Sequence, residues 1–364
     1  MKARRPSVDK IFLLLILLEL FLGLIVLKSA SGALAYERYH SSWSYVSHQL
    51  FLGVLPGLIG MWILSRIDYR RWERWAPAII IVTLAFMVGV FIPGFAAGYG
   101  TAKSWITFGG YVSFQPVEFL KLALVLYLAA LLASPNRSPR QAFIPAIFAF
   151  GIGALLLALQ PDLGSLLVLV AIFVAMVFSA GVPFAYLVAT LLLGGGALYG
   201  FARSAAYRAA RFTVFLHPEL DPQGIGYQIN QAFLVIGSGG LFGRGLGHTS
   251  EANMDLPQIM NDSIFPVVAQ ELGFFFAVGL VALVAAIFFR GLKIAQRADP
   301  FGRLVVIGAI SWIAVQSFVN IGAMIGIVPL TGVPLPLISY GGTAMVANLW
   351  MLGIVLSVSR ANRQ

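Results

Sequence analysis

Ten long apolar runs, separated by shorter polar stretches, extend along most of the 364-residue chain. Each approaches the roughly 20 apolar residues that a helix needs to cross the hydrocarbon core of a bilayer. The runs cover residues 11–30, 48–66, 76–95, 116–133, 143–160, 163–181, 183–202, 263–290, 303–327 and 337–358. The pattern therefore predicts an all-α polytopic membrane protein, with ten transmembrane helices in a single domain over residues 1–364.

The longest interruption is the loop of residues 203–262, between the seventh and eighth predicted helices, which is rich in charge and glycine. Residues 207–215 have the spacing of an amphipathic interfacial helix, and a second helical pattern begins at 227 and ends at Gly237. The run GSGGLFGRGLG occupies residues 237–247. It predicts either a tight re-entrant turn or a loop whose amides and arginine face an anion. Because no strand precedes it and no Walker lysine follows, a nucleotide-binding fold is excluded.

Composition supports the membrane assignment. Hydrophobic residues make up 59% of the chain and charged residues only 10%, against roughly 25% charged residues in soluble domains. The formal charge of +10 arises from Lys and Arg in short loops. Such placement is typical of orientation signals and anionic-lipid contacts, so the charge predicts membrane lipids as partners and no nucleic acid. The chain has no cysteine, which excludes disulfides and thiolate catalysis.

The distribution of basic residues predicts the orientation. Sixteen of the 24 Lys and Arg residues lie in segments that face the cytoplasm if the N-terminus does so. They are Lys2, Arg4, Arg5, Lys10, Arg66, Arg70, Arg71, Arg74, Arg137, Arg140, Arg290, Lys293, Arg297, Arg303, Arg360 and Arg363. This bias predicts both termini in the cytoplasm and the 203–262 loop outside. The first apolar run exceeds the 7–15 residues of a usual signal-peptide core, so a retained signal anchor is expected.

Charged residues inside the apolar runs are costly at membrane depth and so tend to be paired or functional. Glu118 and Lys121 are three residues apart on one helix face, which fits either an internal ion pair or the lining of a polar cavity that takes a headgroup. Glu19 is alone in the first run, and a structural or partner-facing role is expected. Asp162 follows a proline and either caps the next helix or lies at the outer mouth of a cavity.

Cations outside the apolar runs are candidate ligands for an anion. Arg208 and Arg211, three residues apart, could clamp a lipid pyrophosphate or lie among anionic headgroups. Lys103, in a glycine-rich loop, could hold a phosphate as a point charge, although the loop also has the composition of an interfacial segment. Among the carboxylates of the long loop, Asp262 is expected to cap the eighth helix, and Asp255 is expected to be solvated.

Five segments together resemble the SEDS family (shape, elongation, division and sporulation), whose members include RodA and FtsW. They are AKSWITFGGYVSFQPVEFLKLALVLYLA at 102–129, QPDLGS at 160–165, DPQGIGYQINQAFLVIGSGGLFGRGLG at 221–247, NDSIFPVVAQELGF at 261–274 and VNIGAMIGIVPLTGVPLPLISYGGTAMVANL at 319–349. They follow the family's order and spacing over most of the chain after Gly98. The resemblance implies ten transmembrane helices, in agreement with the count of apolar runs.

The resemblance also implies a function. SEDS proteins are peptidoglycan glycosyltransferases that polymerise lipid II into undecaprenyl-linked glycan outside the bacterial cytoplasmic membrane, with a class B penicillin-binding protein as the crosslinking partner. The acceptor hydroxyl needs a general base, and the departing lipid pyrophosphate needs cations. Two alternatives stay open, namely a lipid II flippase and a non-catalytic activator of the penicillin-binding partner.

The family's essential aspartate lies in a motif resembling HTDFIF, and the matching run MNDSIF places Asp262 at that position. Met260 and Asn261 replace the histidine and threonine, and Gln258 replaces the usual glutamate after Leu-Pro. These departures weaken any inference of a histidine or metal near the site. Asp255 is the second candidate for the catalytic carboxylate. A divalent cation, Mg²⁺ or Mn²⁺, could bridge carboxylate and pyrophosphate, but the sequence does not show one.

The resemblance and the charge pattern together give a set of expected substrate-binding residues. They are Lys103, Glu118, Lys121, Arg208, Arg211, Arg244 and Ser339. Ser339 belongs to a stretch of prolines and glycines within the last apolar region. Irregular backbone at membrane depth is tolerated only where protein buries it or where it lines a watery cavity. This stretch is therefore expected to form a wall of the headgroup cavity.

Overall fold

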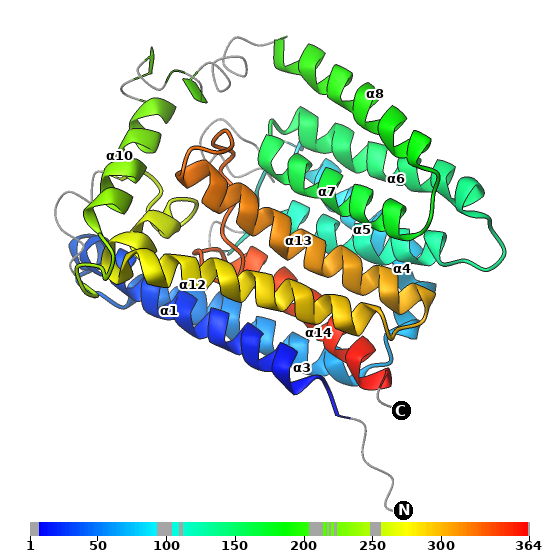
Figure 1. Ribbon diagram of the computed structural model, residues 1–364, viewed down its shortest axis with the longest axis horizontal. Coiled ribbons are helices and arrows are strands. Elements are labelled where there is room, and N and C mark those ends of the chain that lie inside the picture. Colours follow the sequence, from blue (N-terminus) through cyan, green and yellow to red (C-terminus); the bar gives the residue numbers. More distant parts are fainter. Residues whose placement is uncertain are drawn as a thin grey trace, which may run out of the picture.

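The computed structural model describes residues 7–92, 104–108, 112–203, 214–215, 217, 220–221, 224–247 and 256–362. Over these residues the chain is almost entirely helical, and the long helices lie side by side in one bundle (Figure 1). Both ends of the chain leave this bundle at the same end, which is called the terminal end below.

Each of the ten predicted apolar runs coincides with a long helical unit. In chain order these units are α1 (Lys10–Tyr39), the continuous α2 (Ser44–Gln49), η1 (Leu50–Val54) and α3 (Leu55–Arg66), then α4 (Arg70–Gly89), α5 (Pro116–Leu132), α6 (Pro139–Leu159), α7 (Leu163–Ser179), α8 (Phe184–Arg203), α12 (Ile264–Ala295), α13 (Pro300–Met324) and α14 (Gly342–Ala361). Within the described part of the chain, seven units are long and apolar enough to span a membrane. The protein is thus an all-α, multi-pass membrane protein, and the count of ten crossings stays a prediction.

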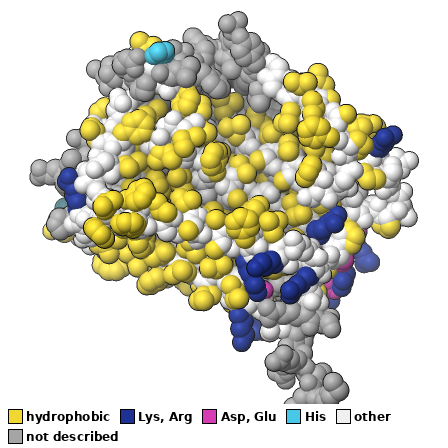
Figure 2. All heavy atoms as spheres, viewed as in Figure 1, with side chains coloured by type: hydrophobic (Ala, Val, Ile, Leu, Met, Phe, Trp, Pro, Cys, Tyr) yellow, Lys and Arg dark blue, Asp and Glu magenta, His cyan; other side chains and the backbone are white. Residues whose placement is uncertain are grey.

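The interior of the bundle is formed by α5, α13 and α14, and other helices surround it. In the most apolar stretch of α13 and of α14, 78% of residues are buried, against 22% in α4. The outer helices expose large apolar side chains, such as Phe148 and Ile144 of α6. Figure 2 shows hydrophobic side chains spread over the face of the bundle in view. This distribution matches a bundle whose polar groups are inside and whose surface faces lipid tails.

The first and last helices differ most from the predicted bounds. Asp9 caps α1 by accepting from the amide of Phe12, and α1 continues past the signal-like Ala-Leu-Ala sequence to Tyr39. Phe12 and Ile16 are fully buried in the core, as expected of a retained helix. The last helix begins at Gly342 rather than at residue 337, because Leu337 has a positive φ of 60° and the amide of Tyr340 donates to the carbonyl of Met260 instead of to a helical partner.

Two connections of the bundle carry structure of their own. Between α4 and α5, β1 (Ile106–Phe108) pairs antiparallel with β2 (Val112–Phe114), a hairpin that the sequence pattern did not predict. In the 203–262 loop, α10 (Ile225–Ser238) confirms the helical pattern predicted to end near Gly237. Most of the amphipathic helix predicted at 207–215 lies outside the described residues.

The glycine run contacts a break in α12. Gly273 has φ of 81° and ψ of 177°, so the helical bonds from the amides of Phe274 and Phe275 to the carbonyls four residues earlier are missing. The glycine run supplies a new acceptor for each of these two amides and a new donor for each of the two carbonyls. The amides of Arg244 and Gly245 donate to the carbonyls of residues 270 and 271, both at 2.9 Å, and the carbonyls of residues 240 and 241 accept from the two phenylalanine amides. These contacts describe a close-packed turn, the first of the two interpretations of the run.

A pair of glycine substitutions tests this packing. A Cβ on Gly239 would lie 2.1 Å from the carbonyl oxygen of Ala269, whereas a Cβ on Gly237 would meet nothing within 4 Å. Gly239→Ala is therefore expected to lower the free energy of unfolding by about 1–3 kcal/mol, the usual cost of overpacking. Gly237→Ala is expected to leave it unchanged or slightly raised, because alanine favours the helix. Unfolding of the two variants in detergent measures the difference, and equal stabilities would contradict the described packing.

Candidate functional site

Asp262 lies two residues before the start of α12 and is 7% exposed. The N-cap position of α12 is taken by Ser263, which makes no side-chain capping bond, so the expectation that Asp262 caps this helix is wrong. Gly332, with φ of +74°, faces the carboxylate: a Cβ there would be 3.8 Å from Asp262 Oδ2. The aspartate is therefore held between the start of α12 and the irregular segment that follows α13.

The backbone of Asp262 is fixed by an amide side chain of α13. Asn320, 2% exposed, donates from Nδ2 to the carbonyl oxygens of Asp262 and Val333, each at 2.8 Å. Residue 266, four positions after Asp262, is proline and has no amide proton, so α12 cannot provide the usual helical donor to that carbonyl. One side chain thus joins the aspartate to the irregular segment.

Residues 329–341, called the C-terminal segment below, are joined at two further points to residues 260–262, the loop that bears Asp262. The Ser339 hydroxyl accepts from the amide of Leu335 at 2.8 Å and donates to the carbonyl of Asn261. The amide of Tyr340 donates to the carbonyl of Met260 at 2.8 Å. Ser339 is 5% exposed. Its hydroxyl therefore positions the loop that bears Asp262, and its predicted contact with substrate stays a prediction.

Glu118 and Lys121 form an ion pair inside the bundle. Lys121 Nζ lies 2.7 Å from Glu118 Oε1 and donates to Gln316 Oε1 at 2.8 Å. Gln316 in turn donates to the carbonyl of Pro334 at 2.9 Å. With exposures of 1% and 0%, the pair has the geometry of the ion-pair alternative. Through Gln316, the pair supports the C-terminal segment at Pro334. Direct contact of either residue with a headgroup stays a prediction.

Asn320 and Gln316 are the site residues that sequence reasoning missed. They lie four positions apart on α13, hence on one face, and both donate to carbonyls of the C-terminal segment. The available signal was two amide side chains at helical spacing within an apolar run. Gln49 of α2 also holds the C-terminal segment, because its Oε1 accepts from the amide of Gly341 at 3.0 Å.

Replacing Asn320 with leucine is expected to destabilise the protein. The substitution leaves two buried carbonyls without their donor, at about 1–3 kcal/mol for an unsatisfied group. Ser317, one turn earlier, is the matched control, because its buried hydroxyl has no hydrogen-bond partner among the described residues. Ser317→Ala is expected to be nearly neutral. Chemical denaturation in detergent measures both variants, and a neutral Asn320→Leu would show that Asn320 does not hold the loop.

The other predicted residues lie apart from this cluster or outside the described chain. Arg244 is exposed, and its Nε donates to the carbonyl of Ser238 at 2.8 Å at the end of α10. Asp162 caps α7 by accepting from the amide of Ser165 at 2.9 Å, as one interpretation predicted. The remaining four predicted site residues are outside the described residues: Lys103, Arg208, Arg211 and Asp255.

A second buried carboxylate, within α12, lies near the glycine run. Glu271, 1% exposed, accepts from the Ser29 hydroxyl at 2.7 Å, and that hydroxyl accepts from the amide of Gly247 at 2.8 Å. Across the described ranges, no three His, Cys, Asp or Glu side chains group as potential metal ligands. The divalent cation stays a prediction.

These features define a class: a polytopic α-helical membrane protein in which buried amides fix an aspartate-bearing loop against a broken segment. Residues 9–364 match the cell cycle protein family of FtsW, RodA and SpoVE. The chain belongs to this family, the SEDS proteins.

Individual relatives match along nearly their whole length. The chain is 37% identical over 368 residues to stage V sporulation protein E of Bacillus subtilis, covering 100% of both chains. It is 34% identical to the probable peptidoglycan glycosyltransferase FtsW of Geobacter metallireducens, covering 96% of this chain and 94% of that one.

Solved structures are similar as well. The crystal structure of Thermus thermophilus RodA matches with a TM-score of 0.73 and 28% identity, over 98% of each chain. A chain of a peptidoglycan synthase complex that coordinates polymerization and crosslinking matches with a TM-score of 0.81 and 27% identity, over 98% of each chain.

Proposed function

We propose that this chain is a peptidoglycan glycosyltransferase, which polymerises lipid II into glycan strands at the outer face of the bacterial cytoplasmic membrane. The observation that carries the proposal is full-length similarity: a relative named as such an enzyme covers 96% of the chain at 34% identity. A class B penicillin-binding protein is the expected partner. A chain of a peptidoglycan synthase complex matches the fold over 98% of its length, which supports that expectation.

Asp262 is proposed as the general base. As the acceptor's 4-hydroxyl oxygen attacks the anomeric carbon of the donor, its proton passes to the aspartate and the bond to the lipid pyrophosphate breaks. A base must be held within hydrogen-bond reach of the proton that it removes. The bonds from Asn320 and Ser339 to the Asp262 loop support such positioning. Asp255 is the alternative base.

The leaving pyrophosphate gains negative charge during the reaction, which fixed cations stabilise. Arg244, at the exposed glycine run, is a proposed ligand of the pyrophosphate. Lys103, Arg208 and Arg211, which lie outside the described residues, are proposed as further ligands. Glu118 and Lys121 would act on the headgroup indirectly, by supporting the C-terminal segment through Gln316. Ser339 lies in that segment, the proposed wall of the headgroup cavity.

The proposed orientation places both termini in the cytoplasm and the 203–262 loop outside. Figure 2 shows Lys and Arg side chains gathered at the terminal end. The excess of basic residues on cytoplasmic segments supports this orientation.

The proposal is tested with the purified chain and its penicillin-binding partner, reconstituted in vesicles with labelled lipid II. Glycan ladders that grow with time are expected. Movement of lipid II between leaflets without ladders would support the flippase alternative. Increased crosslinking of supplied glycan by the partner, again without ladders, would support the activator alternative.

A further inference from the structure

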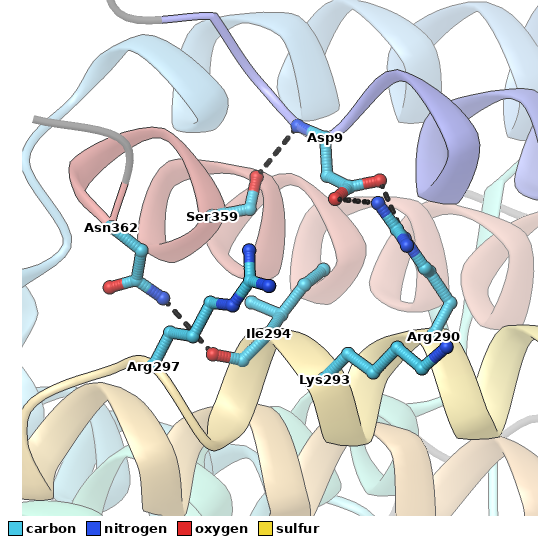
Figure 3. A pocket seen from close by; sticks show the side chains of 7 residues that line it. All are labelled: Asp9, Arg290, Lys293, Ile294, Arg297, Ser359 and Asn362. Atoms are coloured by element: carbon cyan, nitrogen blue, oxygen red, sulfur yellow. Dashed lines mark hydrogen bonds and ion pairs between the residues drawn. The ribbon is translucent and has the colours of Figure 1, made fainter.

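Three basic side chains, two from the end of α12 and one from the turn that follows it, line a small pocket at the terminal end of the bundle (Figure 3). Arg290 and Lys293 are three residues apart on one face of the last turns of α12. Arg297 lies in the turn just after the helix ends at Ala295. The pocket has a volume of about 40 Å³. Its other polar walls come from the residue before α1 and from the end of α14: Asp9, Ser359 and Asn362.

The pocket carries uncompensated positive charge. Arg290 pairs with Asp9 through two bonds, Nε to Oδ1 at 3.0 Å and Nη2 to Oδ2 at 2.7 Å. Asp9 is the one acidic side chain among the described residues that line the pocket. Lys293 and Arg297 are exposed and have no carboxylate within ion-pair distance in the described part of the chain. Two cations therefore face the pocket without a counter-charge.

The walls of the pocket are fixed by bonds between three helices. The amide of Asp9 donates to the Ser359 hydroxyl at 3.0 Å, which joins the start of α1 to α14. Asn362 donates to the carbonyl of Ile294 at 3.0 Å, which joins the end of α14 to α12. With the Arg290 pair, all three helices are held around the cationic side chains. A bound anion would thus meet a preformed site.

The size of the pocket restricts the ligand. A single water needs about 10–15 Å³, so 40 Å³ accommodates a group of phosphate size. Phe289, 61% exposed, lies four residues before Lys293 and so on the same face of α12. An acyl chain could pack there while its headgroup reaches the cations. Basic pockets between membrane helices bind phosphate-bearing lipid headgroups in this way.

We propose that this pocket binds the phosphate group of an anionic phospholipid, with Lys293 and Arg297 as its cationic ligands and Arg290 held in place by Asp9. The proposal does not depend on glycosyltransferase activity. The pocket lies at the terminal end of the bundle, whereas the start of α12, just after Asp262, and residues 329–341 lie at the opposite end. A free phosphate ion offers the same chemistry as the lipid, and the experiment separates these two sources.

The test uses the full chain in mixed micelles and follows its thermal unfolding temperature as phosphatidylglycerol is added, with phosphatidylcholine as the zwitterionic reference. Phosphatidylglycerol is expected to raise the unfolding temperature more than phosphatidylcholine. In Lys293→Gln/Arg297→Gln the half-maximal lipid concentration is expected to rise about 30-fold, since each basic residue contributes about fivefold at a membrane surface. The charge-conserving Lys293→Arg/Arg297→Lys should retain most of the response.

The matched control is Arg137→Gln/Arg140→Gln, which removes the same charge from exposed positions just before α6 and in its first turn. It should respond like the wild type. Equal weakening in both double variants would overturn the proposal, because charge alone would then explain binding. Equal responses to the two lipids would also overturn it.

Inorganic phosphate distinguishes the two sources. Competition with phosphatidylglycerol in the wild type, absent from Lys293→Gln/Arg297→Gln, supports a lipid phosphate as the recognised group. Full stabilisation by inorganic phosphate, with no further gain from lipid, would keep the phosphate site and overturn the lipid as its source. No response to either anion would overturn the site itself.

Discussion

Asp262→Asn is expected to lower the rate of glycan polymerisation by about 10²–10⁴-fold, the usual contribution of a general base. The amide has nearly the same size and shape as the carboxylate, but it cannot accept the acceptor's proton. Folding should be retained, because Asn320 holds the backbone carbonyl of this residue rather than its side chain. The initial rate of ladder formation from labelled lipid II measures the loss.

Glu73→Gln is the control for this experiment. Glu73 is an exposed carboxylate in the first turn of α4, so its substitution removes the same charge without touching the site. It should polymerise like the wild type. A full rate in Asp262→Asn, or an equal loss in both variants, would show that the carboxylate of Asp262 is not the base.

Lys121→Met is expected to give the largest loss of stability, about 3–5 kcal/mol, the usual cost of removing one partner of a buried ion pair. The substitution leaves Glu118 with a carboxylate at membrane depth whose Oε1 has lost its lysine at 2.7 Å. It also removes the hydrogen bond that Lys121 donates to Gln316 Oε1, although that oxygen still accepts from Trp312 Nε1 at 2.8 Å. Denaturation in detergent measures the change.

The double variant Glu118→Leu/Lys121→Met separates the charge from the packing. Replacing both members of a buried pair by apolar groups is often nearly neutral, so the double variant should recover most of the stability lost in Lys121→Met. The single variant Glu118→Leu completes the comparison. If the loss of stability in the double variant equals the sum of the losses in Glu118→Leu and Lys121→Met, the ion pair does not exist in the folded protein.

The helices could be predicted from the sequence because a membrane span needs a long apolar run, and such runs are visible one at a time. Their ends were less accessible. The first turns of α4 are polar (Arg70–Gly89), so hydrophobicity alone placed its start too late. The start of α14 was placed too early, because the apolar composition of the C-terminal segment conceals its irregular backbone.

The contacts that build the site could not be predicted, because they join residues far apart in the chain. Nothing in the sequence around Asn320 indicates that it reaches both Asp262 and Val333. The break in α12 at Gly273 was hidden for the same reason, since its missing bonds are supplied by the glycine run. Asp262 was located through its motif, and its surroundings only through the fold.

The most direct test of the account compares Asp262→Asn and Asp255→Asn in one preparation of chain, partner and labelled lipid II. The account predicts that Asp262→Asn forms ladders about 10²–10⁴-fold more slowly than the wild type, and that Asp255→Asn forms them at a rate within a few-fold of the wild type. Ladders that persist in Asp262→Asn but disappear in Asp255→Asn would contradict it.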